Sequence, residues 1–332
     1  MKLAVFSTKP YDKKYLSSVL GAKHAESGIE LIFHEFALNE DTVSLVDGAD
    51  AICVFVNDVV NDNVISALSE FGVKAILLRC AGFNNVDLDA AQRLRIMVAN
   101  VPSYSPEAVA EFAVALIQTL NRKTHRAYNR VREGNFALDG LLGKTLYGKT
   151  VGIVGVGKIG LATARIMKGF GCRLLAYDPF PSPAFEEYGE YKSLEDLLPQ
   201  CDIVSLHCPL MDGAMLVNTS RGGLLDTESV IHALKTNHIG GLALDVYEAE
   251  GELFYNDHSS TIIQDDKLMR LMTFPNVVVC GHQAFFTEEA LTEIAECTLS
   301  NLEEWIETKT SKNSLTKDLK LRRRESLPVR AI

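Results

Sequence analysis

The chain has 332 residues, of which 47% are hydrophobic and 23% charged, and its formal net charge is −10. This length allows two domains, each with its own core. The acidic balance disfavours nonspecific binding to nucleic acid or to an anionic membrane surface, so a small anionic ligand would need a local cation. No apolar run approaches the roughly 18 residues that a membrane-spanning helix requires.

The seven cysteines are scattered along the chain and never form a CxxC pair. This distribution argues against a disulfide framework and a structural zinc site, and it favours a reducing compartment. The N-terminal sequence MKLAVFSTKP lacks the small-residue cleavage site of a signal peptide and is typical of a first β-strand. We therefore expect a cytoplasmic protein without a metal ion.

The N-terminal third of the chain alternates short β-like runs with helical patterns such as Asn63–Phe71 and Leu88–Leu94. The predicted strands are rich in Val, Ile, Leu and Phe: Lys2–Ser7, Ile29–Phe36, Ala51–Val56, Val73–Arg79 and Ile96–Val101. Alternation of this kind predicts βαβ units and a parallel sheet. A longer helix is predicted at Pro106–Arg122, with Ser105 as N-cap and an apolar stripe that packs in a core.

A second α/β array begins at Lys149. Its predicted strands are Thr150–Val154, Arg173–Tyr177, Asp202–His207, Ala214–Asn218, Gly241–Val246 and Asn276–Cys280. After about Glu303 the chain turns polar, and it ends in the basic segment Lys317–Arg324, which we interpret as a solvated tail.

A dinucleotide-binding motif, GVGKIG, follows the first strand of this second array and precedes a helical pattern. Gly155 allows the tight turn, Gly157 lets a pyrophosphate approach the backbone, and Gly160 lets helix and strand pack closely. Asp178 ends the next strand, where a carboxylate can bind both hydroxyls of the adenosine ribose and repel a 2′-phosphate. The pattern predicts NAD rather than NADP as cofactor.

Three chemically complementary side chains follow three later strands of the array. Arg221 can hold a substrate carboxylate with two parallel hydrogen bonds, and His282 can donate a proton near neutral pH. Glu250, with Asp245 upstream, can hold the histidine in one tautomer and favour its protonated form, although spacing alone leaves Glu248 as a competitor. Reduction of a ketone needs these groups, because a hydride must reach carbon while a proton reaches oxygen.

These segments resemble the D-2-hydroxyacid dehydrogenase family. The resemblance is carried by NTSRGG (218–223), LDVYEAE (244–250) and GHQAF (281–285), and it extends to about Leu302. The N-terminal MKLAVFSTKPYDKKYL, RCAGFNNVDLDAA (79–91) and LNRKTHRAYNRVREGNF (120–136) are similar to the D-lactate dehydrogenase branch.

The resemblance implies two Rossmann- or flavodoxin-like domains with a cleft between them. The substrate domain would comprise residues 1–101 with about 303–332, and the NAD domain residues 102–302. It further implies that His282 protonates pyruvate, that Glu250 rather than Glu248 pairs with it, and that Arg221 orients the carboxylate. The other implied substrate contacts are Ala81, Gly82 and Tyr104, and the further NAD contacts are Lys158, Ile159, Cys208, Pro209, Thr219, Ser220 and Asp245.

The implied reaction is the NADH-dependent reduction of pyruvate to D-lactate by a homo-oligomer, dimer or tetramer, built through the NAD domains. Reduction of glyoxylate or hydroxypyruvate is an alternative, and oxidation of phosphoglycerate would need an additional phosphate-binding cation. A different class is an NAD-binding protein of this fold without turnover. Thermal melting with NADH, followed by NADH oxidation with pyruvate, discriminates between these functions.

The connection between Asp202–His207 and Ala214–Asn218 is unusually short for parallel strands, which normally need a crossover of about a dozen residues. One crossover helix of the NAD domain is therefore expected to be missing. If the second strand paired antiparallel, Arg221 would lie at the wrong edge of the sheet. If it stayed parallel, the first strand would have to shorten or shift and expose apolar surface.

Overall fold

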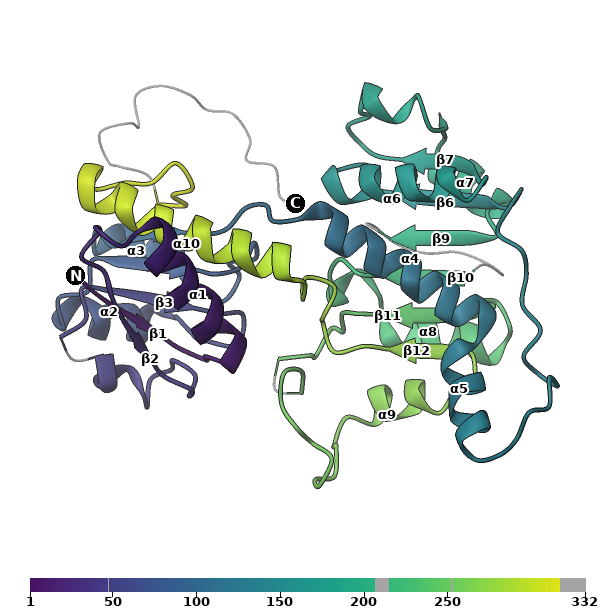
Figure 1. Cartoon of the computed structure of the whole chain (residues 1–332), viewed down its shortest axis with the longest axis horizontal. Helices are drawn as coiled ribbons and strands as arrows, with labels where there is room; N and C mark the ends of the chain where they lie inside the picture. The colour runs from purple at the N-terminus through teal and green to yellow at the C-terminus, as the bar shows by residue number, and fades with distance from the viewer. Residues whose placement is uncertain (47, 207–214, 252, 317–332) are drawn as a thin grey trace. The chain divides into compact units, whose positions relative to one another are not determined.

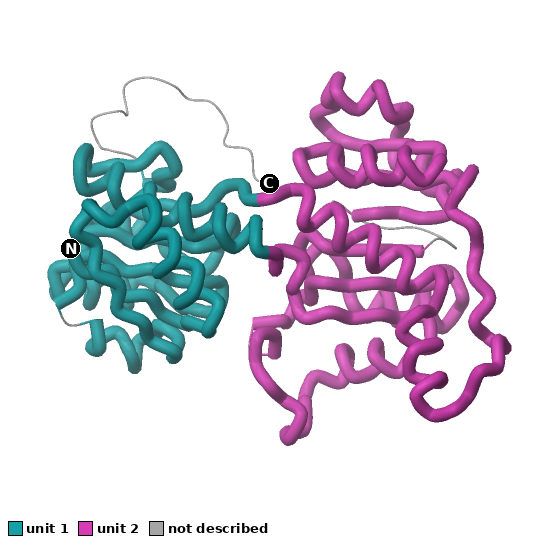
Figure 2. Tube along the Cα trace, in the orientation of Figure 1, with its two compact units in different colours: residues 1–104, 288–332 teal, residues 105–287 magenta. Residues whose placement is uncertain are grey.

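The computed structural model describes residues 1–46, 48–206, 215–251 and 253–316. The chain divides into two compact units (Figure 2). Unit 1 comprises Met1–Tyr104 together with Glu288–Ile332, and unit 2 comprises Ser105–Thr287. The basic segment Lys317–Arg324 lies outside the described residues, and so do Cys208 and Pro209.

Unit 1 is built on a five-stranded parallel sheet with the strand order β2-β1-β3-β4-β5. Figure 1 labels β1, β2 and β3 of this sheet. Its strands are β1 (Lys2–Val5), β2 (Glu30–Phe33), β3 (Ala51–Val54), β4 (Ala75–Leu78) and β5 (Met97–Ala99). Its helices are α1 (Pro10–Lys23), η1 (Val43–Val46), α2 (Asp62–Glu70), α3 (Leu88–Arg93) and α10 (Glu288–Thr308). Strands β3 and β4 are buried along their whole length, as expected for a sheet covered on both faces.

Each face of this sheet has its own core. Helices α2 and α3 contribute Ile65 and Ala91 to one core, whereas α1 and α10 contribute Leu16 and Leu299 to the other. Trp305, near the end of α10, is also buried. The whole of α10 therefore belongs to unit 1, so the boundary lies at Glu288 and not near residue 303, where the sequence turns polar.

Unit 2 contains a seven-stranded parallel sheet with the order β12-β11-β10-β9-β6-β7-β8. Its strands are β6 (Thr150–Val154), β7 (Arg173–Tyr177), β8 (Glu190–Tyr191), β9 (Ile203–Leu206), β10 (Met215–Asn218), β11 (Gly241–Leu244) and β12 (Val277–Val279). Its α-helices are α4 (Pro106–Arg122), α5 (Thr124–Arg132), α6 (Lys158–Gly169), α7 (Leu194–Leu197), α8 (Thr227–Lys235) and α9 (Asp266–Met272). Short 3-10 turns lie at η2 (Pro183–Phe185), η3 (Leu198–Gln200) and η4 (Gly222–Leu224).

Helices cover both faces of this second sheet. Ile117 of α4 and Met167 of α6 are fully buried in one core, and Leu197 of α7, Val230 of α8 and Leu271 of α9 belong to the other. The predicted helix Pro106–Arg122 is thus present with the predicted bounds, and its apolar stripe packs in the core of unit 2. Ser105 stands at its N-cap position, but its side chain makes no capping hydrogen bond.

Strands β9 and β10 are parallel neighbours, with Met215 opposite Ile203 and Asn218 opposite Leu206. The antiparallel alternative is therefore wrong. Because β9 has four residues, the connection from the end of β9 back to the start of β10 must span only about 13 Å, and a segment as long as residues 207–214 can reach about 27 Å. Leu206 and Leu216 are buried, so the expected exposure of apolar surface does not occur at these strands. The predicted loss of a crossover helix falls on 207–214, outside the described residues.

Candidate active site

A tight turn joins β6 to α6 and holds the glycine motif. Gly155 has φ +95°, a conformation that other residues rarely adopt, and its N–H donates to the carbonyl of Tyr177, 2.8 Å away. A Cβ on Gly160 would lie 2.1 Å from the carbonyl oxygen of Gly155, so only glycine allows the helix to start this close to the turn. A Cβ on Gly157 would meet no atom within 4 Å, which leaves the N-terminus of α6 open to a ligand.

The carboxylate of Asp178 lies beside this turn, at the end of β7. One oxygen accepts the N–H of Val156 at 2.7 Å and the other accepts the N–H of Phe180 at 2.8 Å. Both oxygens are therefore held in place, and each has a second lone pair that a ribose hydroxyl could use. Lys158 and Ile159 begin α6, between Gly157 and Gly160.

The loop after β10 carries Arg221 and is fixed by a buried asparagine. The side chain of Asn218 donates to the carbonyl of Arg221 at 2.9 Å and accepts the N–H of Ser220 at 3.0 Å. The guanidinium of Arg221 is exposed and contacts the carbonyl of Ser220 at 2.7 Å. The hydroxyl of Thr219 is buried and has no hydrogen-bond partner among the described residues, so a bound ligand could satisfy it.

The loops after β10 and β11 touch at Gly222. A Cβ there would lie 2.1 Å from the backbone carbonyl of Tyr247, so glycine at this position lets the two loops meet. Because β10, β11 and β12 are adjacent and parallel, their carboxyl ends bring Arg221, Asp245 and His282 to one edge of the sheet. The glycine turn after β6 opens at the same edge.

His282 and Glu250 form the central polar contact at this edge. Nδ1 of His282 lies 2.8 Å from Oε1 of Glu250, and the side chains are 19% and 24% exposed. The other oxygen of Glu250 accepts the N–H of Tyr247 at 2.9 Å, which fixes the carboxylate. Nε2 of His282 makes no hydrogen bond within the described part of the chain, so it can face a substrate. Glu248, the competitor on spacing, is exposed.

Asp245 fixes the backbone of the His282 loop. Its carboxylate accepts the N–H groups of Gln283 at 2.8 Å and of Ala284 at 2.9 Å, and its carbonyl accepts the N–H of His282 at 2.7 Å. These contacts hold His282 in a left-handed conformation with φ 52°. Burial raises the pKa of the Asp245 carboxyl above its usual range, and the two N–H groups oppose that shift. In this position Asp245 supports the histidine loop.

Tyr255 and Cys280 also lie next to the histidine, and sequence patterns gave no signal for either. The hydroxyl of Tyr255 donates to the carbonyl of His282 at 3.3 Å, and the two rings are 5.9 Å apart. Burial raises the pKa of the Cys280 thiol to about 11, so it stays protonated at neutral pH and cannot serve as a nucleophile there.

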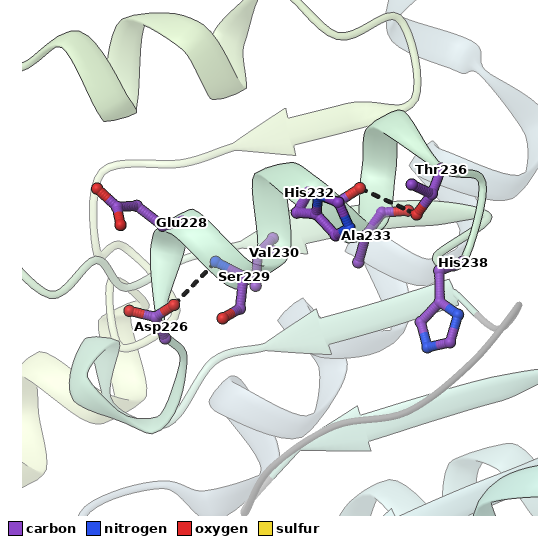
Figure 3. Close-up of a pocket in the computed structure, with 8 residues that line it drawn as sticks. All are labelled: Asp226, Glu228, Ser229, Val230, His232, Ala233, Thr236 and His238. Carbon is purple, nitrogen blue, oxygen red and sulfur yellow. Dashed lines mark hydrogen bonds between the residues drawn. The ribbon is translucent and has the colours of Figure 1, made fainter.

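The predicted substrate contacts of unit 1 lie after β4 and β5. The carbonyl of Ala81 accepts a hydrogen bond from the side chain of Asn100 at 2.8 Å, and the carbonyl of Gly82 accepts one from the Cys80 thiol at 3.2 Å. Tyr104 is the last residue of the first segment of unit 1. A separate hollow of about 630 Å³ in unit 2 is lined by α8 and His238 and contains none of the predicted site residues (Figure 3).

Comparison with known proteins identifies the family. Residues 114–284 match the model of the D-isomer specific 2-hydroxyacid dehydrogenase family, NAD binding domain. A D-lactate dehydrogenase of Curvularia clavata is 64% identical over 95% of both chains. The chain belongs to the D-2-hydroxyacid dehydrogenases.

Solved structures of this dehydrogenase family have the same fold. The apo-structure of the Escherichia coli D-lactate dehydrogenase superimposes with a TM-score of 0.86 at 49% identity, covering 95% of this chain and all of that one. The pyruvate reductase of Chlamydomonas reinhardtii gives a TM-score of 0.87 at 42% identity, covering 94% and 98%.

The residues at the glycine turn of this dehydrogenase fit NAD, the cofactor of its family. The open N-terminus of α6 suits the pyrophosphate, and the Asp178 carboxylate suits a ribose with free hydroxyls. The buried Thr219 hydroxyl, which lacks a partner within the described residues, provides a further polar group at the same edge of the sheet.

Proposed function

We propose that this dehydrogenase reduces pyruvate to D-lactate with NADH, and catalyses the reverse oxidation. The observation that carries the proposal is the 2.8 Å contact between His282 and Glu250, at the same sheet edge as Arg221 and the glycine turn. A proton donor and a carboxylate-binding cation are the groups that a 2-oxo acid requires. The names of the relatives support pyruvate as the substrate.

In the proposed mechanism, His282 is the general acid. Glu250 accepts a hydrogen bond from Nδ1 and so holds the ring in the orientation in which Nε2, when it carries a proton, can donate that proton to the carbonyl oxygen of the substrate. Asp245 acts indirectly, since it fixes the backbone of the histidine loop through Gln283 and Ala284. In the oxidation direction His282 removes the hydroxyl proton.

Arg221 is proposed to bind the substrate carboxylate, together with backbone N–H groups at Ala81 and Gly82. Its guanidinium is exposed, so the exchange of its contact with Ser220 for a carboxylate costs little. Tyr104 is proposed to line the substrate pocket. Residues 155–160, Asp178, Thr219 and Ser220 would hold NADH, which would supply the hydride when bound. Cys208 and Pro209 remain proposed cofactor contacts.

A matched pair of glutamate variants tests this assignment. Glu250→Gln keeps the shape of the side chain but replaces the carboxylate that holds the histidine ring by a neutral amide, so we expect kcat for pyruvate to fall about 10–100-fold. Glu248→Gln should leave kcat unchanged, because Glu248 is exposed. NADH oxidation is measured with pyruvate, glyoxylate and hydroxypyruvate. Equal effects of the two substitutions would contradict the role of Glu250, and a preference for glyoxylate or hydroxypyruvate would correct the substrate.

The proposed activity would be overturned if the protein binds NAD but catalyses no reaction. A cooperative melt whose midpoint rises with NADH, without oxidation of NADH by any of these acids, would identify this outcome. A melt without cooperativity would show instead that the chain does not form the fold.

We further propose a cytoplasmic homo-oligomer that associates through unit 2. Helix α5 has no buried residue, and the segment around it exposes large apolar side chains, with Phe136 74%, Leu138 81% and Leu142 88% accessible. A group of this kind is typical of a protein interface.

The six cysteines that the structure describes are free thiols, which supports the proposed reducing compartment, the cytoplasm. No described helix is long and apolar enough to cross a bilayer.

A charged double substitution tests this interface. We expect Leu138→Glu combined with Leu142→Glu to convert the oligomer into monomers, since two carboxylates would have to lose water on association. Light scattering coupled to size-exclusion chromatography gives the mass. Ile262→Glu is the control, because Ile262 is 85% exposed but lies outside this segment. A wild-type monomer, or an unchanged mass in the double variant, would contradict the proposal.

A further inference from the structure

The loop Cys80–Gly82 presents its N–H groups in directions that the two residues after β5, Asn100 and Val101, determine. The N–H of Val101 donates to the carbonyl of Cys80 at 3.1 Å. The side-chain amide of Asn100 donates to the carbonyl of Ala81 at 2.8 Å. In a planar trans peptide the N–H points opposite to the carbonyl of the preceding residue. Fixing these two carbonyls therefore fixes the N–H directions of Ala81 and Gly82.

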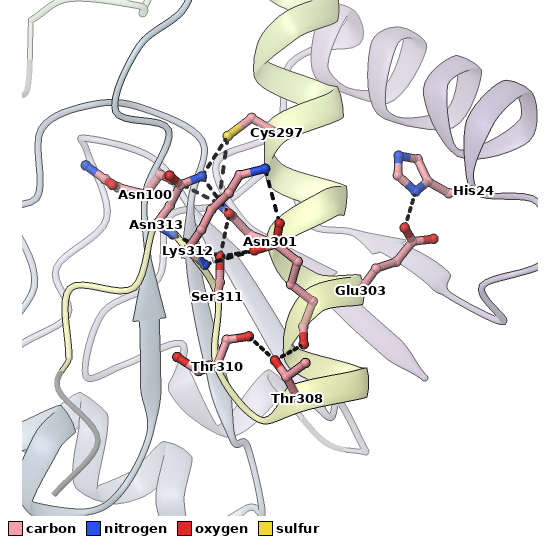
Figure 4. Close-up of polar contacts among 11 residues, drawn as sticks. His24, Asn100, Cys297, Asn301, Glu303, Thr308, Thr310, Ser311, Lys312 and Asn313 are labelled. Atoms are coloured by element: carbon pink, nitrogen blue, oxygen red, sulfur yellow. Dashed lines mark hydrogen bonds and ion pairs between the residues drawn. The ribbon is translucent and has the colours of Figure 1, made fainter. Parts of the chain in front are cut away.

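Asn100 is itself held by the C-terminal part of unit 1. It is 5% exposed, and its carbonyl accepts the side-chain amide of Asn301 in α10 at 2.9 Å. Asn301 in turn accepts hydrogen bonds at 2.8 Å from the side chains of Ser311 and Asn313 (Figure 4). The backbone N–H of Asn100 donates to the carbonyl of Asn313 at 3.4 Å, so the same segment holds Asn100 from two sides.

This segment also closes the edge of the sheet. Ser314 forms an antiparallel bridge with Ala99 of β5, and the N–H of Leu315 donates to the carbonyl of Val98 at 2.7 Å. Among the described residues β5 has a strand neighbour on one side only, which is β4. The bridge therefore restrains the end of β5 that carries Asn100.

We infer that Asn100 is a positioning residue for the substrate carboxylate, and that residues 311–314 with Asn301 hold it in place. The inference rests on the proposed role of the Ala81–Gly82 backbone in binding a 2-oxo acid. Asn100 does not touch the substrate. It orients the Gly82 N–H by holding the other end of the same peptide unit, and a donor fixed in advance binds a carboxylate at a lower entropic cost.

Asn100→Ala removes the hydrogen bond to Ala81 and should raise KM for pyruvate about ten-fold, the effect of one neutral hydrogen bond. The Kd of NADH and kcat at saturating pyruvate should change less than about two-fold, because the substitution leaves unit 2 intact. The control is Asn121→Ala in unit 2, which also removes a buried asparagine that holds backbone groups, the N–H and carbonyl of Lys144. Asn121→Ala therefore loses side-chain hydrogen bonds of the same kind, but it leaves the loop Cys80–Gly82 unchanged.

Asn313→Ala is the second variant, in case Asn100→Ala does not fold. It removes one support of Asn301 and should raise KM for pyruvate about two- to three-fold. The inference is wrong if Asn100→Ala has the same KM for pyruvate as the control Asn121→Ala. If Asn100→Ala does not fold, the same comparison is made with Asn313→Ala. A change in the Kd of NADH as large as that in KM would equally contradict the inference, since it would indicate general loss of structure.

Binding of oxamate, a non-reacting analogue of pyruvate, to the NADH complex separates this inference from the proposed reaction. If the wild type binds oxamate but does not reduce pyruvate, the reaction is wrong, and a ten-fold weaker Kd in Asn100→Ala still supports the positioning role. If the wild type neither binds oxamate nor turns over pyruvate, both proposals fall. If turnover is present and Asn100→Ala binds oxamate as the wild type does, only the positioning role falls.

Discussion

Replacing His282 by alanine is expected to reduce kcat for pyruvate by about 10²–10⁴-fold, the usual contribution of a general acid. The variant removes Nε2, the proposed proton donor, and among the described residues it leaves the Glu250 carboxylate with its contact to the N–H of Tyr247. The glycine turn and Asp178 lie on other strands, so the Kd of NADH should stay within about two-fold. Steady-state kinetics and a separate titration with NADH measure the two quantities.

The control for this histidine is His232→Ala on α8, whose side chain is exposed and lies among the residues that line the separate hollow. It should leave both turnover and NADH binding unchanged. A loss of NADH binding in His282→Ala as large as the loss of turnover would contradict its role as proton donor.

Replacing Arg221 by lysine is expected to raise KM for pyruvate about 10–100-fold. Lysine keeps the charge but cannot present the two parallel N–H donors that match a carboxylate. The loop itself should stay in place, because Asn218 holds it through the backbone atoms of Ser220 and Arg221. Kinetics with pyruvate and a titration with NADH provide the test.

Arg173→Lys is the matched control, since Arg173 begins β7 and therefore lies at the amino edge of the same sheet, opposite to the site. Its KM for pyruvate should equal that of the wild type. If Arg221→Lys also leaves KM unchanged, the substrate carboxylate is not held by Arg221.

The sequence was most informative where a single physical signal was strong. Unbroken apolar runs predicted all strands except β8, a strand of two residues, and the glycine motif predicted the β6–α6 turn. Strand ends were less predictable. The first strand was expected to reach Ser7 but stops at Val5, because Ser7 takes a left-handed conformation with φ 51° that ends the extended ladder.

Other features had no local signal. Helix α5 buries none of its residues and its apolar side chains Tyr128 and Val131 are exposed, so no core-facing pattern indicated it. The polar residues after Glu303 likewise did not indicate a helix, although α10 continues to Thr308. At the site, residue types predicted Arg221, His282 and a glutamate, but spacing could not choose between Glu248 and Glu250. Asn218 and Asn100 hold backbone carbonyls, and such partners become visible only when the fold brings them together.

The two segments of unit 1 lie before and after unit 2 in the chain, which imposes an order on their synthesis. Residues 1–104 leave the ribosome before unit 2, whereas α10 and residues 311–316, which cover one face of their sheet and extend its edge, are made after it. Unit 2 is contiguous and can complete its core earlier, as domains generally fold as units during synthesis. A nascent chain can therefore form the glycine turn before Asn100 gains the contacts with Asn301 and Asn313 that hold it. A chain that ends prematurely would then contain a nucleotide-binding fold without a complete substrate domain.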